Sequence, residues 1–150
     1  MRSFHLWPFE RKRRAELGTG LTVLIADQDP YVRADLEQFV CRRGWHAFFA
    51  ADGTTALRCL TMSQDVKAGF GRIDVVIADA HLPGRSGLDL LILVKSRGWD
   101  MEVILTTDST STRFRSELAR FGAAAVLPKP VSLMALEQTL ARIRLERQER

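Results

Sequence analysis

The feature that most constrains the fold of this 150-residue chain is a repeated alternation of two apolar patterns. Short, nearly unbroken apolar runs predict strands, and between them apolar residues recur at the spacing of a helix. A continuous apolar run is typical of a strand buried on both faces, which means a parallel sheet covered by helices. The strands are expected at 21–26, 45–50, 73–78, 101–107 and 123–128.

A helical pattern follows each of these runs. Pro30 suits the first turn of the first helix, and Gly44 and Gly122 are typical of residues that end one. The apolar positions of the helices lie within 32–40, 56–60, 88–95, 114–121 and 133–143. Five strands that alternate with five helices predict an α/β fold with a doubly wound parallel sheet.

Length and charge limit the domain organisation and the kind of partner. The chain has room for one domain, expected over 21–147, with an extension over 1–20 and a short end at 148–150. Of the net charge of +4, residues 1–20 contribute +3, from five Lys/Arg against two Asp/Glu, and the rest contributes +1, from 17 against 16. Because the expected domain is nearly neutral, direct binding to nucleic acid is not expected.

The extension combines three aromatic residues, Phe4, Trp7 and Phe9, with a basic run at 11–14. It is either a mobile, solvated tail or a docking segment for an acidic partner or an anionic membrane surface, and the sequence leaves both open. The chain has no apolar run of about 20 residues and no apolar core of a secretory signal near its start, so we expect a cytoplasmic protein.

Polar residues gather where the predicted strands end. In a parallel sheet the carboxyl ends of the strands share one edge, where ligands bind. Asp79 by itself could equally cap the turn that follows it. Four strand ends with polar residues predict instead one pocket of carboxylates, hydroxyls and an ammonium. The residues are Asp27, Gln28 and Asp29 after the first strand, Asp79 after the third, Thr106, Thr107 and Asp108 after the fourth, and Lys129 after the fifth.

This set of residues, in its order and spacing, resembles the receiver domain of bacterial response regulators, a family of two-component signalling proteins. The resemblance covers residues 21 to about 147 and rests on VLIADQDPYVR, DVVIADAHLPGRSGLDLL, VILTT and FGAAAVLPKP. A proline and a glycine follow Asp79 by four and eight residues, as in the family. The resemblance implies the flavodoxin-like strand order 2-1-3-4-5.

The resemblance also implies a role for each site residue. Asp79 would accept a phosphoryl group from a histidine kinase, and Lys129 and the hydroxyl of Thr107 would contact the phosphoryl oxygens. Asp27, Asp79 and the backbone carbonyl of His81 would hold Mg²⁺. The family further implies a cis peptide bond between Lys129 and Pro130. Such a protein is a phosphoryl acceptor that at most phosphorylates and dephosphorylates itself, rather than an enzyme.

Three residues depart from the family pattern. Gln28 replaces a metal-binding acid, which predicts weaker Mg²⁺ binding unless the amide oxygen or Asp29 serves as a ligand. Asp108 adds a negative charge beside the incoming phosphoryl group. Val126 stands where an aromatic residue usually swings inward, so any output must come from shifts of loops and backbone.

Three functions therefore remain open. The first is a single-domain response regulator that meets a sensor histidine kinase or phosphotransfer protein, and then signals by contact with a downstream protein. The resemblance also allows a homodimer through the face of the helix at 114–121, the strand at 123–128 and the helix at 133–143. The second is a pseudo-receiver, a binding module independent of phosphorylation. The third is a phosphatase of the haloacid-dehalogenase type, with Asp27 as nucleophile and Asp29 as acid/base.

Overall fold

The computed structural model describes residues 20–65, 67 and 71–149, so most of the N-terminal extension lies outside the described residues. Its centre is a parallel five-stranded sheet in the order β2-β1-β3-β4-β5, which confirms the predicted fold and strand order. The strands are β1 (Thr22–Ala26), β2 (His46–Ala50), β3 (Val75–Asp79), β4 (Glu102–Thr107) and β5 (Ala125–Pro128). The helices are α2 (Pro30–Arg42), α3 (Gly53–Gln64), α4 (Gly87–Ser96), α5 (Thr112–Arg120) and α6 (Leu133–Gln148).

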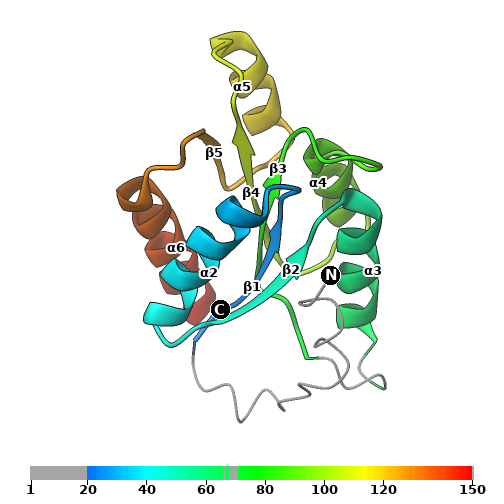
Figure 1. Ribbon diagram of the computed structural model, residues 1–150. Coiled ribbons are helices and arrows are strands. Elements are labelled where there is room, and N and C mark those ends of the chain that lie inside the picture. The colour runs from blue at the N-terminus through cyan, green and yellow to red at the C-terminus, as the bar shows by residue number, and fades with distance from the viewer. Residues whose placement is uncertain (1–19, 66, 68–70, 150) are drawn as a thin grey trace.

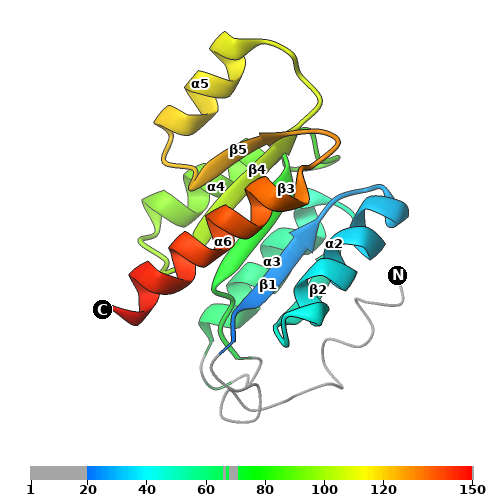
Figure 2. The same ribbon diagram turned by 90° about the vertical axis from the view of Figure 1, so that its left-hand side faces the viewer.

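The helices cover both faces of the sheet, with α2 and α6 on one side and α3 and α4 on the other (Figures 1 and 2). Successive residues of β1 point to opposite faces: Leu24 packs in the core with α3 and α4, and Ile25 packs in the core with α2 and α6. Because both faces are buried, a strand of this sheet needs apolar residues at every position. This is the physical reason for the unbroken apolar runs.

The parallel register brings the strand ends to one edge of the sheet. Ala26 of β1 pairs with Ala78 of β3, so Asp27 and Asp79 follow paired positions. Asp79 in turn pairs with Thr106 of β4. The backbone N–H of Lys129 donates to the carbonyl of Thr107 over 2.8 Å, which holds the end of β5 against that of β4.

Each of these five helices begins after a residue whose side chain accepts a hydrogen bond from a backbone N–H of the first turn. Such a cap satisfies a donor that the helix itself leaves unpaired. The caps are Asp29, Asp52, Ser86, Ser111 and Ser132 for α2, α3, α4, α5 and α6 in turn. Gly44 follows α2 at a φ of 72°, a conformation that few residues other than glycine adopt.

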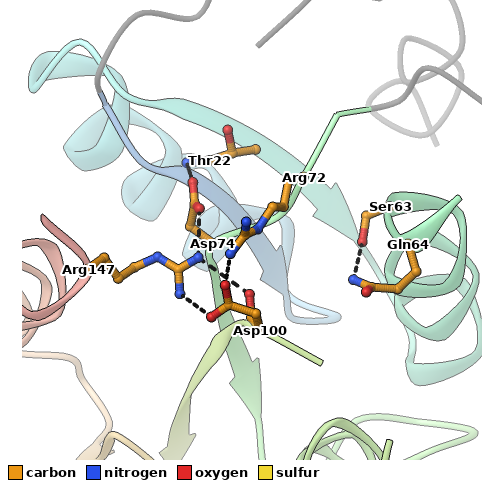
Figure 3. Close-up of polar contacts among 7 residues, drawn as sticks. All are labelled: Thr22, Ser63, Gln64, Arg72, Asp74, Asp100 and Arg147. Atoms are coloured by element: carbon orange, nitrogen blue, oxygen red, sulfur yellow. Dashed lines mark hydrogen bonds and ion pairs between the residues drawn. The ribbon is translucent and has the colours of Figure 1, made fainter. Parts of the chain in front are cut away.

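A cluster of charged residues lies at the amino ends of the strands, on the side of the sheet opposite to their carboxyl ends (Figure 3). The buried carboxylate of Asp74 accepts the N–H of Thr22 over 2.9 Å and lies 3.1 Å from the guanidinium of Arg147, near the end of α6. Arg147 also pairs with Asp100 at 3.2 Å, and Asp100 pairs with Arg72. The cluster therefore ties the last turn of α6 to the start of the sheet.

None of the helices within the described ranges is both long and apolar enough to span a lipid bilayer.

Candidate functional site

Lys129, after β5, lies between the carboxylate of Asp27, which follows β1, and that of Asp79, the last residue of β3. Its ammonium Nζ is 2.9 Å from Oδ2 of Asp27 and 2.8 Å from Oδ2 of Asp79. The three residues are far apart in the chain, and the sheet register alone brings them together. The peptide bond between Lys129 and Pro130 is cis, as the resemblance implied.

The two carboxylates also determine the charge state of Lys129. Burial by itself lowers the pKa of the ammonium, but the hydrogen bonds to Asp79 and Asp27 and the charges of the two carboxylates outweigh it, so the pKa is raised. The ammonium therefore stays protonated throughout the physiological range. Asp27 is only 2% exposed, and a carboxylate buried to this extent requires a partner of opposite charge.

The turn after β1 is organised by the carboxylate of Asp27. Oδ1 of Asp27 accepts the N–H of Asp29 over 2.9 Å. The guanidinium of Arg33 donates to the backbone carbonyl of Asp27 over 2.7 Å. The carboxylate of Asp29 accepts the N–H of Tyr31 over 2.8 Å, as the cap of α2, and the side chain of Gln28 is exposed. Of Asp27, Gln28 and Asp29, only Asp27 has a side chain that contacts Lys129 in the described structure.

The loop after β3 packs closely around Asp79. The N–H of His81 donates to Oδ1 of Asp79 over 2.9 Å. At Gly87, the first residue of α4, a Cβ atom would lie 2.5 Å from the backbone oxygen of Asp79. The glycine eight residues after Asp79 is therefore required by the close approach of α4 to the end of β3.

The sequence did not reveal a second close contact of this loop. The N–H of Gly53, at the start of α3, donates to the carbonyl of Pro83 over 2.9 Å. A Cβ atom on Gly53 would lie 1.8 Å from the carbonyl oxygen of Arg85. An aspartate followed by a glycine, as at Asp52 and Gly53, is typical of a turn, but no local pattern indicates the packing of Gly53 against a loop so far along the chain.

The end of β4 contributes Thr107, which is fully buried. Its hydroxyl accepts the N–H of Ser109 over 3.1 Å. Asp108 is exposed, and Val126 is half-buried against the core on the side of α3 and α4. His81 is exposed, but its ring stacks on Phe114 of α5, a contact that the sequence did not reveal.

The donor chemistry of the pocket determines which cation it could hold. Within the described part of the chain, no three His, Cys, Asp or Glu side chains are grouped closely enough to hold a metal ion. Asp27 and Asp79 offer two neighbouring carboxylates, and the resemblance implies the backbone carbonyl of His81 as a third donor. Mg²⁺ prefers oxygen donors, binds through one or two carboxylates and keeps several waters. The donor set therefore fits Mg²⁺.

Known response regulators are similar in sequence to most of this chain. Response regulator MprA of Mycobacterium sp. (strain KMS) is 31% identical over 122 residues, which are 81% of this chain and 48% of that protein. Two-component response regulator ORR21 of Oryza sativa subsp. indica is 33% identical over 132 residues, which are 87% of this chain and 18% of that protein. The chain thus spans less than half the length of either relative.

Solved structures share the fold. The receiver domain of Francisella response regulator 1452 matches with a TM-score of 0.75 at 23% identity, over 85% of this chain and 98% of that one. The chemotaxis protein CheY4 of Vibrio cholerae matches with a TM-score of 0.66 at 27% identity, over 83% of this chain and 98% of that one. Residues 23–141 match the response regulator receiver domain family. The chain therefore belongs to the receiver-domain family of two-component response regulators, whose members are phosphoryl acceptors rather than enzymes in the usual sense.

Proposed function

We propose that this chain accepts a phosphoryl group on Asp79 from a histidine kinase or a phosphotransfer protein, and then signals by contact with another protein. The observation that carries the proposal is the position of the Lys129 ammonium, 2.8 Å from Asp79 and 2.9 Å from Asp27. A fixed cation beside a carboxylate at the carboxyl edge of a parallel sheet is suited to receive a group that brings negative charge.

In the proposed reaction, a carboxylate oxygen of Asp79 attacks the phosphorus atom of a phosphohistidine. The new oxygen–phosphorus bond forms as the phosphorus–nitrogen bond breaks, and the electron pair of that bond stays on the imidazole. Lys129 is placed to neutralise the phosphoryl oxygens, and the hydroxyl of Thr107 can donate a hydrogen bond to one of them. Attack by water on the phosphorus later restores the carboxylate and releases phosphate.

A divalent cation adds to this chemistry. Mg²⁺, when bound by Asp27, Asp79 and the carbonyl of His81, supplies positive charge that offsets the charge of the phosphoryl group. Asp27 and Asp79 together carry two negative charges, and Lys129 offsets one of them. Because Gln28 is neutral, the pocket attracts a cation less strongly than one with a third acid.

The proposal is tested by intact-mass analysis after incubation with acetyl phosphate and Mg²⁺. The wild-type protein should gain one phosphoryl group, and Asp79→Asn should gain none. The matched control is Asp108→Asn, which also removes one carboxylate after a strand but leaves Asp79 intact, and it should gain one group. If the wild type gains no group, or if Asp79→Asn gains one, Asp79 is not the acceptor.

A second candidate is a binding module that works without phosphorylation. The exposed side chain of Gln28 and the small side chain of Val126 favour it. Absence of any phosphoryl gain in the same experiment, together with an intact fold, would favour this module over the acceptor.

The phosphatase alternative requires the carboxylate of Asp29 as acid/base. In the structure this carboxylate accepts the N–H of Tyr31 as the cap of α2, which argues against that role. Turnover of a generic phosphate ester that is lost in Asp27→Asn but kept in Asp79→Asn would revive the alternative.

We propose that the phosphoryl donor docks on a groove of about 440 Å³ between α2 and the segment after β5. Lys129 and the apolar side chains of Val32 and Leu133 line it, so a partner seated there has direct access to the pocket. Leu133→Asp should slow transfer from a phosphorylated partner but leave phosphorylation by acetyl phosphate unchanged. Equal slowing of both reactions would contradict the assignment.

The remaining assignments are also proposals. The domain spans 21–147 and acts in the cytoplasm, and residues 1–20 form a separate extension. Removal of residues 1–19 should leave phosphorylation by acetyl phosphate unchanged.

A homodimer through α5, β5 and α6 would appear as a concentration-dependent mass in light scattering.

A further inference from the structure

Of all the helices, α5 is the least embedded in the described structure. Leu118 is its one buried residue, and Phe114 packs against the core while half-exposed. In Figures 1 and 2 the helix stands clear of the others, beyond the end of β4. A helix with few buried contacts is easily displaced, so the contacts at its first turn decide where it lies.

One set of contacts connects the first turn of α5 with Thr107. The hydroxyl of Thr107 accepts the N–H of Ser109 over 3.1 Å, and the hydroxyl of Ser109 accepts the N–H of Ser111 over 3.2 Å. The hydroxyl of Ser111 then accepts the N–H of Phe114 over 3.2 Å. Three consecutive side-chain to backbone hydrogen bonds therefore join the buried end of β4 to Phe114.

A second set of contacts reaches the same residue from Asp79. Oδ1 of Asp79 accepts the N–H of His81, as described above, and the His81 ring stacks on the ring of Phe114. The ring centroids are 5.7 Å apart and the planes are inclined by 14°. This distance and nearly parallel orientation are those of an attractive aromatic pair.

We propose that Phe114 is a positioning residue that couples the Asp79 loop to α5. The inference rests on the proposed function and deepens it, because it names the element that responds to the phosphoryl group. Val126 has no aromatic ring to move inward, whereas Phe114 receives contacts from both sides of the pocket. Its stacking on His81 holds the loop that carries the proposed metal-binding carbonyl.

The coupling acts in both directions, because a free energy that links two sites is reciprocal. A phosphoryl group on Asp79 gives the hydroxyl of Thr107 and the N–H of His81 new oxygen atoms to bind. Both sets of contacts then shift together, and the first turn of α5 shifts with them. In return, the position of α5 alters how the Asp79 loop is held.

The first experiment measures amide hydrogen exchange in the unphosphorylated protein, so it does not depend on the proposed function. Phe114→Leu keeps an apolar side chain but removes the ring, and it should speed exchange of the His81 amide several-fold. Phe121→Leu makes the same substitution just after the last residue of α5 and should leave the exchange of that amide unchanged. Equal effects of the two variants, or no effect of either, would overturn the proposal.

The reciprocal variants separate coupling from general destabilisation. His81→Leu should speed exchange in the first turn of α5, and His81→Phe, which keeps a flat ring, should restore protection. Phe114→Tyr should behave as wild type at the His81 amide. If His81→Phe fails to restore protection in a folded protein, stacking is not the link.

The second experiment compares exchange in α5 before and after treatment with acetyl phosphate and Mg²⁺. The wild type should show a change in residues 112–116, and Phe114→Leu should lose it while still gaining one phosphoryl group by mass. Failure of the wild type to gain a phosphoryl group refutes the proposed function, and the first experiment still decides the coupling. A phosphorylated Phe114→Leu variant with the full change in α5 refutes the coupling alone.

Discussion

Gln28 is one of the three departures from the pattern that the family resemblance implies, and it places a neutral, exposed amide next to Asp27 in the chain. Gln28→Glu adds a negative charge next to two carboxylates of which only one is neutralised by Lys129. We expect Mg²⁺ to bind about tenfold more tightly, which corresponds to ~1.4 kcal/mol. Calorimetric titration with Mg²⁺ measures the change.

The matched control for this prediction is Gln138→Glu, which adds the same charge to an exposed position on α6. Its Mg²⁺ affinity should equal that of the wild type. If both variants bind Mg²⁺ equally tightly, the gain reflects net charge and residue 28 lies outside the cation site.

The two cysteines should differ sharply in reactivity. Burial raises the pKa of the Cys59 thiol to about 11, whereas Cys41 is exposed. Because the thiolate is the reactive form, a thiol reagent at pH 8 should label Cys41 and spare Cys59 until the protein unfolds. Fast labelling of Cys59 in the folded protein would contradict its burial.

The raised pKa of the Cys59 thiol should make the stability of the protein depend on pH. In the unfolded chain Cys59 loses its proton near its ordinary pKa of about 8.5, while the folded protein keeps it up to about pH 11. Between these values the folded state binds more protons, so the free energy of unfolding falls as the pH rises. Cys59→Ala should lack this contribution to the slope, as urea unfolding at pH 8, 9 and 10 would reveal.

Some residues of the pocket were predictable because their positions follow from the sheet. Asp79 is the last residue of β3, Asp27 and Lys129 directly follow β1 and β5, and parallel strands end on one side of the sheet. The stacking of His81 on Phe114 was not predictable, since it depends on where a loosely packed helix lies relative to a loop. The use of the Asp29 carboxylate as a helix cap could have been anticipated from the proline that follows it.

At the scale of elements, the contact between α3 and the loop after β3 is tight enough to test. Gly53→Ala would place a Cβ atom 1.8 Å from the carbonyl oxygen of Arg85, so the loop must move. We expect a loss of about 1–3 kcal/mol of stability and slower phosphorylation by acetyl phosphate. Urea unfolding and intact-mass time courses measure the two effects.

Gly98→Ala is the control, because Gly98 has a φ of 63° and open space around it. It should lose about 1–2 kcal/mol through backbone strain, while the rate of phosphorylation stays that of the wild type. A Gly53→Ala variant that is destabilised but phosphorylated at the normal rate would mean that the loop adapts without disturbing Asp79.

Element boundaries were less predictable than element types. The third apolar run suggested a strand from residue 73, whereas β3 begins at Val75. Asp74 accounts for the difference, because its carboxylate turns toward the N–H of Thr22 and the guanidinium of Arg147. Arg147 comes from the far end of the chain, and no local pattern indicates such a contact.

For the molecule as a whole, the charged cluster in Figure 3 should serve stability and not phosphorylation. The side chains of Arg147 and Asp74 are 11% and 5% exposed, and Arg147→Ala leaves a buried carboxylate with one partner fewer. We expect a loss of about 2 kcal/mol in urea unfolding. The extent of phosphorylation by acetyl phosphate should not change, because the cluster lies at the edge of the sheet opposite to Lys129.

Arg113→Ala provides the comparison. Arg113 is 90% exposed and pairs with Glu117 on the surface of α5, so its loss should cost less than about 0.5 kcal/mol. If Arg147→Ala is no more destabilising than Arg113→Ala, the end of α6 does not depend on the buried pair.

The ammonium of Lys129, shared by Asp27 and Asp79, means that this protein carries a built-in counter-ion for its acceptor carboxylate. Dissolved salt screens charges at the surface but has little effect on a partly buried pair in direct contact. The contact between the Asp79 carboxylate and the Lys129 ammonium should therefore persist at both low and high salt concentration. The NMR chemical shift of the Lys129 ammonium should stay constant from low to high ionic strength. A chemical shift that changes with salt concentration would contradict this prediction.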